Sequence, residues 1–167
     1  MQHVATATDC TDAILVGYDG SQRSAQALRW AVSLAGRLGC RVVVARTWAL
    51  SSAPRPASWA PGFVPPMTDF EGAVLDRLRA DVKALHLPDD AEVTCEVLHG
   101  SAGQRLVESS KGAQMLVVGS RGGGGFLGLK LGSTASQVVG NAHCPVVVVP
   151  VESDETPVVP DAGLANG

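Results

Sequence analysis

The sequence predicts a single α/β domain whose parallel sheet is covered by helices on both faces. Three observations lead to this fold class. Short apolar runs alternate with longer amphipathic segments, which is typical of repeated β-α-β units. Four of the five runs are apolar at nearly every position, as strands buried on both faces are. The chain has 167 residues, of which 46% are hydrophobic and 17% charged, so it can bury one core.

The five apolar runs predict five strands. Polar residues or glycines bound each run, and each is too short for a typical helix. The third run alternates apolar and polar residues, which is typical of a strand exposed on one face. In chain order the predicted strands are 13–18, 41–47, 93–98, 115–119 and 145–150.

Helical spacing of apolar residues marks four segments between the strands. Ser21 and Ser101 stand at N-cap positions, and Gln104 would complete a capping box with Ser101. Gly39 follows the first helix, where glycine commonly ends one. The predicted helices are 22–38, 68–87, 101–111 and 133–141.

Composition divides the chain into three parts. Residues 1–12 are polar and unpatterned, so we expect a flexible arm, and 13–151 form the predicted domain. Residues 152–167 are rich in Pro, Gly, Asp and Ala without periodicity, so we expect a disordered tail. Within the domain, the proline-rich stretch 49–67 predicts a long loop, which is either a binding lid or a surface excursion.

Charge and cysteine content exclude several classes of protein. A net charge of −3 argues against a nucleic-acid or anionic-membrane surface, since both need concentrated Lys and Arg. No apolar run reaches the roughly 20 residues that span a bilayer, and residues 1–6 do not resemble a signal peptide. We therefore expect a cytoplasmic protein. Its four cysteines form no CxxC pair, so we expect free thiols and no zinc site.

A dense glycine stretch carries the functional signal. It runs from Gly119, the last residue of the fourth predicted strand, to Gly132, just before the last helix. Glycines let backbone amides approach an anion closely, and the helix N-terminus adds free amides and a positive dipole end. The hydroxyls of Ser133 and Thr134 are further donors. This pattern predicts a phosphate site, whereas the alternative is a flexible surface linker.

Two other phosphate motifs fit less well. A Walker A loop ends in Gly-Lys-Ser/Thr, but here Lys130 precedes Leu131 and Gly132. A GxGxxG match at Gly123, Gly125 and Gly128 arises easily within a glycine run. A dinucleotide site would also need a second half that the chain lacks.

The spacing Gly119, two residues, Gly122, nine residues, Gly132-Ser133 resembles the ATP-binding signature of the universal stress protein family. Residues 14–21 and 143–150 extend the likeness, which covers 13–150. The resemblance implies a Rossmann-like, open five-stranded parallel sheet with strand order 3-2-1-4-5. It also implies a nucleotide-dependent stress-response regulator that binds ATP, with Mg or Mn held through the phosphates.

The resemblance further implies roles for single residues. Asp19 would lie beside the adenosine, Gly17 on the same edge, and Thr47 where a backbone group meets the adenine. Strand 145–150 would pair with its twin in a homodimer, and an apolar edge strand independently needs a cover. The implied phosphate-binding residues are Gly119, Gly122, Gly132 and Ser133, with Ser120, Arg121, Gly123, Gly124, Gly125 and Thr134 lining the same loop.

Some alternatives stay open at this stage. Before Gly20-Ser21, Asp19 could simply form a turn. Arg121 and Lys130 could offset phosphate charge or lie in solvent.

The sequence shows no nucleophile–base pair, so we expect a binding protein without catalytic residues and with at most slow ATP hydrolysis. The ligand could also be AMP or cyclic AMP. An enzyme of the related adenine α-hydrolase group is disfavoured, because the loop after the first strand lacks that group's SGGxDS motif.

Overall fold

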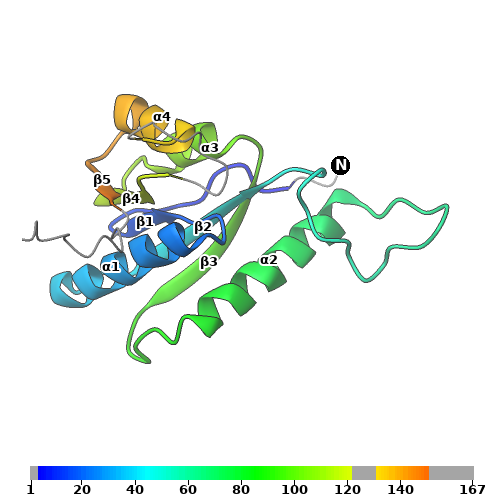
Figure 1. The fold of residues 1–167 in the computed structure, drawn as a ribbon, viewed down its shortest axis with the longest axis horizontal. Coiled ribbons are helices and arrows are strands. Elements are labelled where there is room, and N and C mark those ends of the chain that lie inside the picture. Colours follow the sequence, from blue (N-terminus) through cyan, green and yellow to red (C-terminus); the bar gives the residue numbers. More distant parts are fainter. Residues whose placement is uncertain (1–3, 122–130, 151–167) are drawn as a thin grey trace, which may run out of the picture.

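The fold is a five-stranded parallel sheet with order β3-β2-β1-β4-β5, flanked by four helices (Figure 1). A computed structural model of the chain describes residues 4–121 and 131–150. The predicted α/β class and the strand order 3-2-1-4-5 are confirmed. Along the chain the elements are β1 (Ile14–Gly17), α1 (Gln22–Leu38), β2 (Val42–Trp48), α2 (Met67–Ala84), β3 (Val93–His99), α3 (Ala102–Ser109), β4 (Met115–Gly119), α4 (Ser133–Asn141) and β5 (Val146–Val149).

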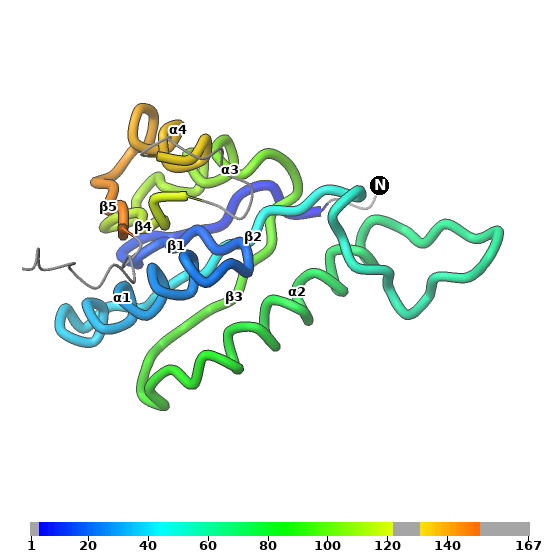
Figure 2. The backbone as a smooth tube through the Cα atoms, in the orientation of Figure 1, coloured from blue at the N-terminus to red at the C-terminus, as the bar shows by residue number. Residues whose placement is uncertain are grey.

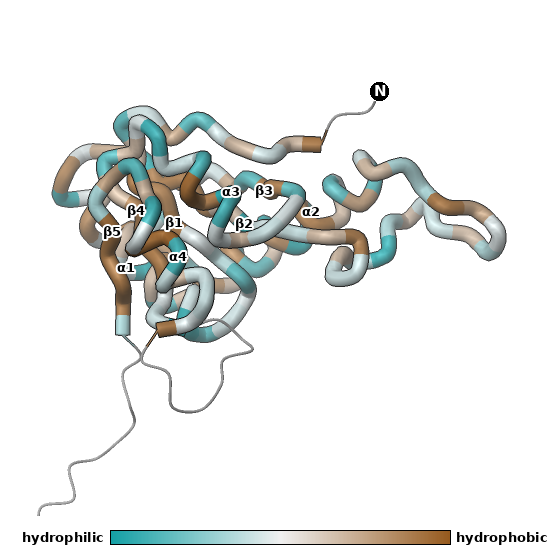
Figure 3. The backbone as a smooth tube through the Cα atoms, turned by 90° about the horizontal axis from the view of Figure 1, so that it is seen from above, coloured by the Kyte–Doolittle hydropathy of each residue, from teal (hydrophilic) through white to brown (hydrophobic). Residues whose placement is uncertain are grey.

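The two faces of the sheet bury separate cores. Because side chains alternate along a strand, Ile14 and Val16 pack with α1 and α2, whereas Leu15 packs with α3 and α4. Figure 1 shows α1 and α2 on one side of the sheet and α3 and α4 on the other. Figure 3 shows the hydrophobic colour concentrated in the neighbouring strands β1, β4 and β5. The buried strands therefore hold both helix layers in place.

Local hydrogen bonds explain where α1 begins and ends. The amide of Ser24 donates to Ser21 Oγ at 3.2 Å, which confirms the predicted N-cap. Gly39 takes the left-handed conformation with φ of 66°, and its amide donates to the carbonyl oxygen of Ala35. Glycine reaches this φ without the strain that a Cβ causes.

The predicted capping box of α3 is wrong. Ser101 occupies the N-cap position, but its side chain makes no capping hydrogen bond. Gln104 turns to the next helical turn instead, where its Nε2 donates to Glu108 Oε1 at 3.3 Å. The helix starts where residue type and position predict. The capping-box bond from Gln104 back to the start of the helix does not form, because the Gln104 side chain bonds Glu108 instead.

Residues 4–12 make contacts that differ from the expected loose arm. The His99 amide donates to the carbonyl oxygen of Ala5 at 2.7 Å, and the Thr8 amide donates to Ser109 Oγ at 3.2 Å. Cys10 is fully buried. These contacts tie the segment to the end of β3 and to α3, because the buried Cys10 supplies an apolar anchor. Residues 1–3 and the predicted tail 152–167 lie outside the described residues.

The loop between β2 and α2 projects beyond the N-terminal end of α2 (Figure 2). Trp59 packs edge-on against Phe70 at the start of α2, with ring centroids 6.3 Å apart. Within residues 4–121 and 131–150, no helix has the length and apolar composition needed to cross a bilayer.

Candidate functional site

A cleft opens at the carboxyl ends of β1, β2 and β4, where ligands bind in open α/β sheets. It has a volume of about 80 Å³. Residues from β1, β2, β4, the turn after β1 and the N-terminal parts of α1, α3 and α4 form its walls. They are Gly17, Tyr18, Asp19, Ser24, Ala45, Thr47, Ala102, Leu106, Val118, Gly119, Arg121, Thr134 and Ala135.

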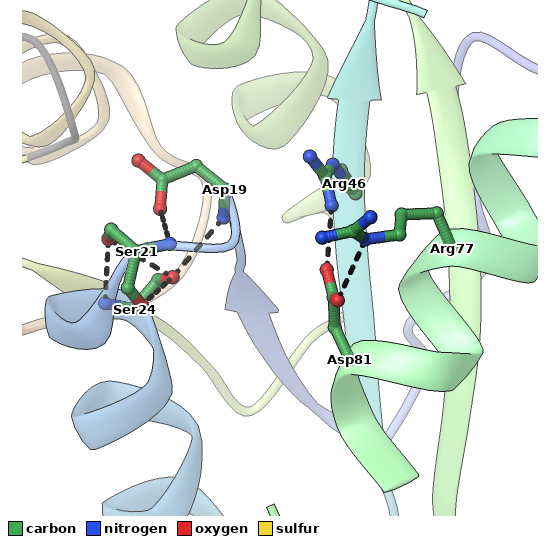
Figure 4. Close-up of polar contacts among 6 residues, drawn as sticks. All are labelled: Asp19, Ser21, Ser24, Arg46, Arg77 and Asp81. Carbon is green, nitrogen blue, oxygen red and sulfur yellow. Dashed lines mark hydrogen bonds and ion pairs between the residues drawn. The ribbon is translucent and has the colours of Figure 1, made fainter. Parts of the chain in front are cut away.

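The turn after β1 places Asp19 at the rim of the cleft (Figure 4). Asp19 Oδ1 accepts a hydrogen bond from the Ser21 amide at 2.9 Å, which forms an Asx-turn. The Asp19 amide donates to Ser24 Oγ at 3.3 Å. Gly20 has φ of 85°, a conformation that a Cβ would strain. Asp19 thus has the predicted turn-forming role and also lines the cleft.

Gly17 and Tyr18 connect this turn to the sheet. A Cβ on Gly17 would lie 2.8 Å from Leu106 Cδ1, so any side chain at this position would displace Leu106 of α3. Tyr18 is buried, and burial together with the negative charge of Asp81 raises the pKa of its phenol. The amide of Tyr18 donates to the carbonyl oxygen of Ala45 at 2.9 Å. These contacts make the floor of the cleft rigid and largely apolar.

The end of β2 sends side chains to two sides. Ala45 and Thr47 line the cleft, while Trp48 packs with the core on the α1–α2 face. Thr47 therefore lies across the cleft mouth from the β4–α4 side.

Two backbone hydrogen bonds hold the start of α4 beside the end of β4. The Ser120 amide donates to the Val149 carbonyl oxygen at 3.0 Å, and the Gly132 amide donates to the Ser120 carbonyl oxygen at 2.7 Å. Gly132 is the N-cap of α4, so the first amides of the helix have no acceptor within it. Thr134 and Ala135, in that first turn, line the cleft. The helix end thus offers amides and a partial positive charge to an anion.

Gly119 differs from Gly17 in its surroundings. A Cβ on Gly119 would lie 3.4 Å from the backbone of Arg23 in α1, which is ordinary contact distance. Packing therefore does not demand glycine at this position.

The structure brings six of the predicted site residues into the cleft, and three more adjoin it. Gly122, Gly123, Gly124 and Gly125 lie outside the described residues. The six that line the cleft are Gly17, Asp19, Thr47, Gly119, Arg121 and Thr134. The adjoining three are Ser120, Gly132 and Ser133, at the β4–α4 junction.

Sequence reasoning missed the apolar part of the lining. Ala102 and Leu106 come from α3, and Val118 and Ala135 complete the wall. Their residue types carry no chemical signal, because small and apolar residues at these spacings read as core. Tyr18 and Ser24 were adjacent to predicted site residues and could have been found from that proximity.

The described part of the chain holds no group of three or more His, Cys, Asp or Glu side chains placed to bind a metal ion. Within it, Asp19 is the single carboxylate on the cleft wall.

Comparison with known proteins adds a family to this geometry. The sequence profile of the universal stress protein family matches residues 11–150. The chain belongs to the universal stress protein family. The resemblance read from its glycine spacing is therefore confirmed.

Relatives of this family member include two universal stress proteins of Mycobacterium tuberculosis. One is 33% identical over 150 residues, covering 88% of this chain and 46% of the relative. The other is 33% identical over 146 residues, covering 85% of this chain and 49% of the relative. The chain thus spans about half the length of these relatives.

Solved structures share the fold. UspA from Lactobacillus plantarum is 22% identical with a TM-score of 0.63, covering 85% of this chain and 99% of that one. A universal stress protein solved in complex with cAMP is 23% identical with a TM-score of 0.57, covering 85% and 98%. One from Archaeoglobus fulgidus, solved in complex with dAMP, is 19% identical with a TM-score of 0.54, covering 83% and 96%.

Proposed function

We propose that the chain binds an adenine nucleotide, and ATP in particular, in the cleft at the ends of β1, β2 and β4. The observation that carries the proposal is the hydrogen bond from the Gly132 amide to the Ser120 carbonyl oxygen. It holds the free amides of α4 beside a cleft whose opposite rim carries Asp19 and Thr47. A polar rim at one end and an anion-binding helix end at the other suit a nucleoside phosphate.

Solved relatives support the adenine part of the proposal. Their structures hold cAMP or dAMP, ligands that share an adenine base, a sugar and one phosphate. In this chain the base and sugar would lie between Asp19 and Thr47, and the phosphates would face the first turn of α4 and Arg121. ATP is favoured because the glycine spacing matches the family's ATP-binding signature.

We further propose that occupancy of the cleft regulates a stress response and that catalysis is absent or slow. The polar groups of the described cleft wall are hydroxyls, one carboxylate and the Arg121 guanidinium, which bind a polyphosphate better than they activate water. Mg or Mn would enter with the phosphates, and hydrolysis would also require a positioned water. The protein would act in the cytoplasm.

A homodimer through residues 145–150 completes the proposal. β5 is an edge strand, and all four of its valines are only half-buried in the single chain. Pairing with a second copy would cover this apolar edge.

Mass spectrometry of nucleotide released from the purified protein, followed by calorimetric titration with ATP, AMP and cAMP, tests the ligand. We expect released adenine nucleotide and tightest binding for ATP. Equal affinities for ATP and AMP would favour the alternative of a monophosphate binder, and production of ADP during incubation would favour a slow ATPase. Absence of binding by all three would overturn the proposal.

A further inference from the structure

A second cavity lies on the opposite side of the β2 end, under the loop that leads to α2. Its volume is about 180 Å³, comparable to an engineered cavity of about 150 Å³ that holds benzene. It adjoins the first cleft, because Asp19 and Thr47 line both. The other residues of its walls are Arg46, Trp48, Ser52, Pro54, Val74 and Arg77.

Two guanidinium groups meet at one carboxylate beside this cavity (Figure 4). Arg46 Nη1 donates to Asp81 Oδ2 at 3.1 Å, and Arg77 Nε donates to Asp81 Oδ1 at 3.0 Å. Arg46 and Asp81 are largely buried, with side-chain exposures of 26% and 21%. Asp81 therefore holds both arginines in place, although Asp81 itself does not line the cavity.

The arginines keep donors for a ligand. A guanidinium has five N–H groups, and Asp81 takes one hydrogen bond from each arginine. In Figure 4, nitrogen atoms of Arg46 point away from Asp81. Two guanidiniums held in this way are suited to a carboxylate, whose two oxygens match their fork geometry.

Charge limits the ligand to one negative group. Asp19 also lines the cavity, so Arg46, Arg77, Asp19 and Asp81 together sum to zero. A monoanion leaves a net charge of −1 among these groups, whereas a doubly charged phosphate would leave −2 close to Asp19, so the monoanion is the less costly ligand.

Part of the remaining wall is apolar or aromatic, beside the hydroxyls of Thr47 and Ser52. Trp48, Pro54 and Val74 face the cavity, and Trp48 is 3% exposed. Its buried Nε1–H has no acceptor among the described residues. An apolar ligand chain in contact with this wall would itself leave water, which favours its burial.

We propose that this second cavity binds a small carboxylic acid with a short apolar chain, its carboxylate held by Arg46 and Arg77 and its chain against Trp48, Pro54 and Val74. The site goes beyond the nucleotide cleft and uses the opposite face of β2. It also gives the loop after β2 a role, since Ser52 and Pro54 of that loop form part of the wall.

Titration of the ¹⁵N-labelled full chain with butanoate, without nucleotide, tests the site. We expect saturable shifts of the Trp48 indole N–H and of the Ser52 amide. Butan-1-ol, which lacks the carboxylate, and inorganic phosphate, which lacks the chain, should each bind at least tenfold more weakly. Because no nucleotide is present, the result is independent of whether the chain binds ATP.

Arginine variants extend the test, with Arg77 and Arg79 of α2 as a matched pair. Arg46→Gln and Arg77→Gln should each raise the Kd for butanoate roughly tenfold or more, as expected for loss of a charged hydrogen bond. Arg79→Gln removes the same charge from an exposed position outside the cavity. This variant should change the Kd for butanoate less than twofold. If Arg46→Gln does not fold, Arg77→Gln carries the test, since its side chain is 68% exposed.

Three results would overturn the proposal. The first is that the NMR shifts do not saturate with butanoate. The second is that Arg79→Gln weakens butanoate binding as much as Arg46→Gln or Arg77→Gln does. The third is saturable shifts confined to Thr134 and Ala135, which would place the ligand in the first cleft.

Discussion

The Gly132 amide donates a hydrogen bond to the carbonyl oxygen of Ser120 at 2.7 Å, which joins the start of α4 to the end of β4. The Ser120 amide in turn donates a hydrogen bond to the Val149 carbonyl oxygen of β5. The helix end is therefore positioned by the sheet itself, and its amides face the cleft before any anion binds. Preorganisation of this kind lowers the entropic cost of binding.

A negative side chain at this helix end should block phosphate binding without harming the fold. In Thr134→Glu, the carboxylate would occupy the anion position in the cleft, while an acidic residue in the first turn stabilises a helix by roughly 0.3–1 kcal/mol. We expect ATP affinity to fall at least tenfold in calorimetry. Ser136→Glu puts the same charge on an exposed position of α4 and should retain affinity within a few-fold. Retained ATP affinity in Thr134→Glu would argue against phosphates at α4.

The two strand-end glycines should respond differently to a methyl group. Gly17→Ala places a Cβ 2.8 Å from Leu106 Cδ1, so we expect the free energy of unfolding to drop by roughly 1–3 kcal/mol. Gly119→Ala meets only ordinary contacts at 3.4 Å and should unfold within about 0.5 kcal/mol of the unaltered chain. Urea denaturation measures both. If Gly17→Ala lowers the free energy of unfolding no more than Gly119→Ala does, Leu106 moves aside at little cost.

Asp19 can be separated into its turn-forming and ligand-binding roles. Asp19→Asn keeps an oxygen acceptor for the Ser21 amide, so we expect nearly unchanged stability but weaker nucleotide binding, by roughly tenfold. Asp19→Ala loses both and should also lower the free energy of unfolding by about 1 kcal/mol. Thermal unfolding and ATP titration of the two variants, side by side, show which role each change removes. Full affinity in Asp19→Asn would leave only the turn role.

The outward edge of β5 should control assembly. The carbonyl oxygens of Pro145 and Val149 accept bonds from Leu116 and Ser120, so in a parallel ladder Val148 directs its amide away from β4. Val148→Pro removes that outward donor, and proline is tolerated on an edge strand. We expect the variant to sediment as a folded monomer while the unaltered chain sediments as a dimer. A dimer that survives the substitution would place the interface elsewhere.

Stability should fall at alkaline pH because of Cys10. Burial raises the pKa of this thiol to about 11 from its usual 9.0. The folded state therefore keeps the proton that the unfolded state releases, and the contribution present below pH 9 is lost as pH rises towards 11. The loss is at most about 3 kcal/mol. Urea denaturation of Cys10→Ala across this range should show a shallower decline than the unaltered chain, whatever the cost of the substitution at neutral pH. Parallel declines would exclude Cys10 as the source.

Much of the fold was predictable because its signals are local. Ser21 and Gly39 bound α1 through hydrogen bonds within a few residues, and the apolar runs became strands in the expected order. The prediction failed for the capping box, because the Ser101 side chain makes no capping hydrogen bond and Gln104 donates to Glu108 instead. It also differed for residues 4–12, whose partners His99 and Ser109 lie far along the chain.

The sequence by itself determined the alternation of strands and helices, the family, and the polar residues at the strand ends, because each depends on spacing along the chain. Only the tertiary structure decided that Leu106 closes the cleft floor and that Arg46 and Arg77 share Asp81. Those relationships depend on how helices pack across the sheet. Packing brings together residues whose types, taken singly, are those of any core or any solvated surface.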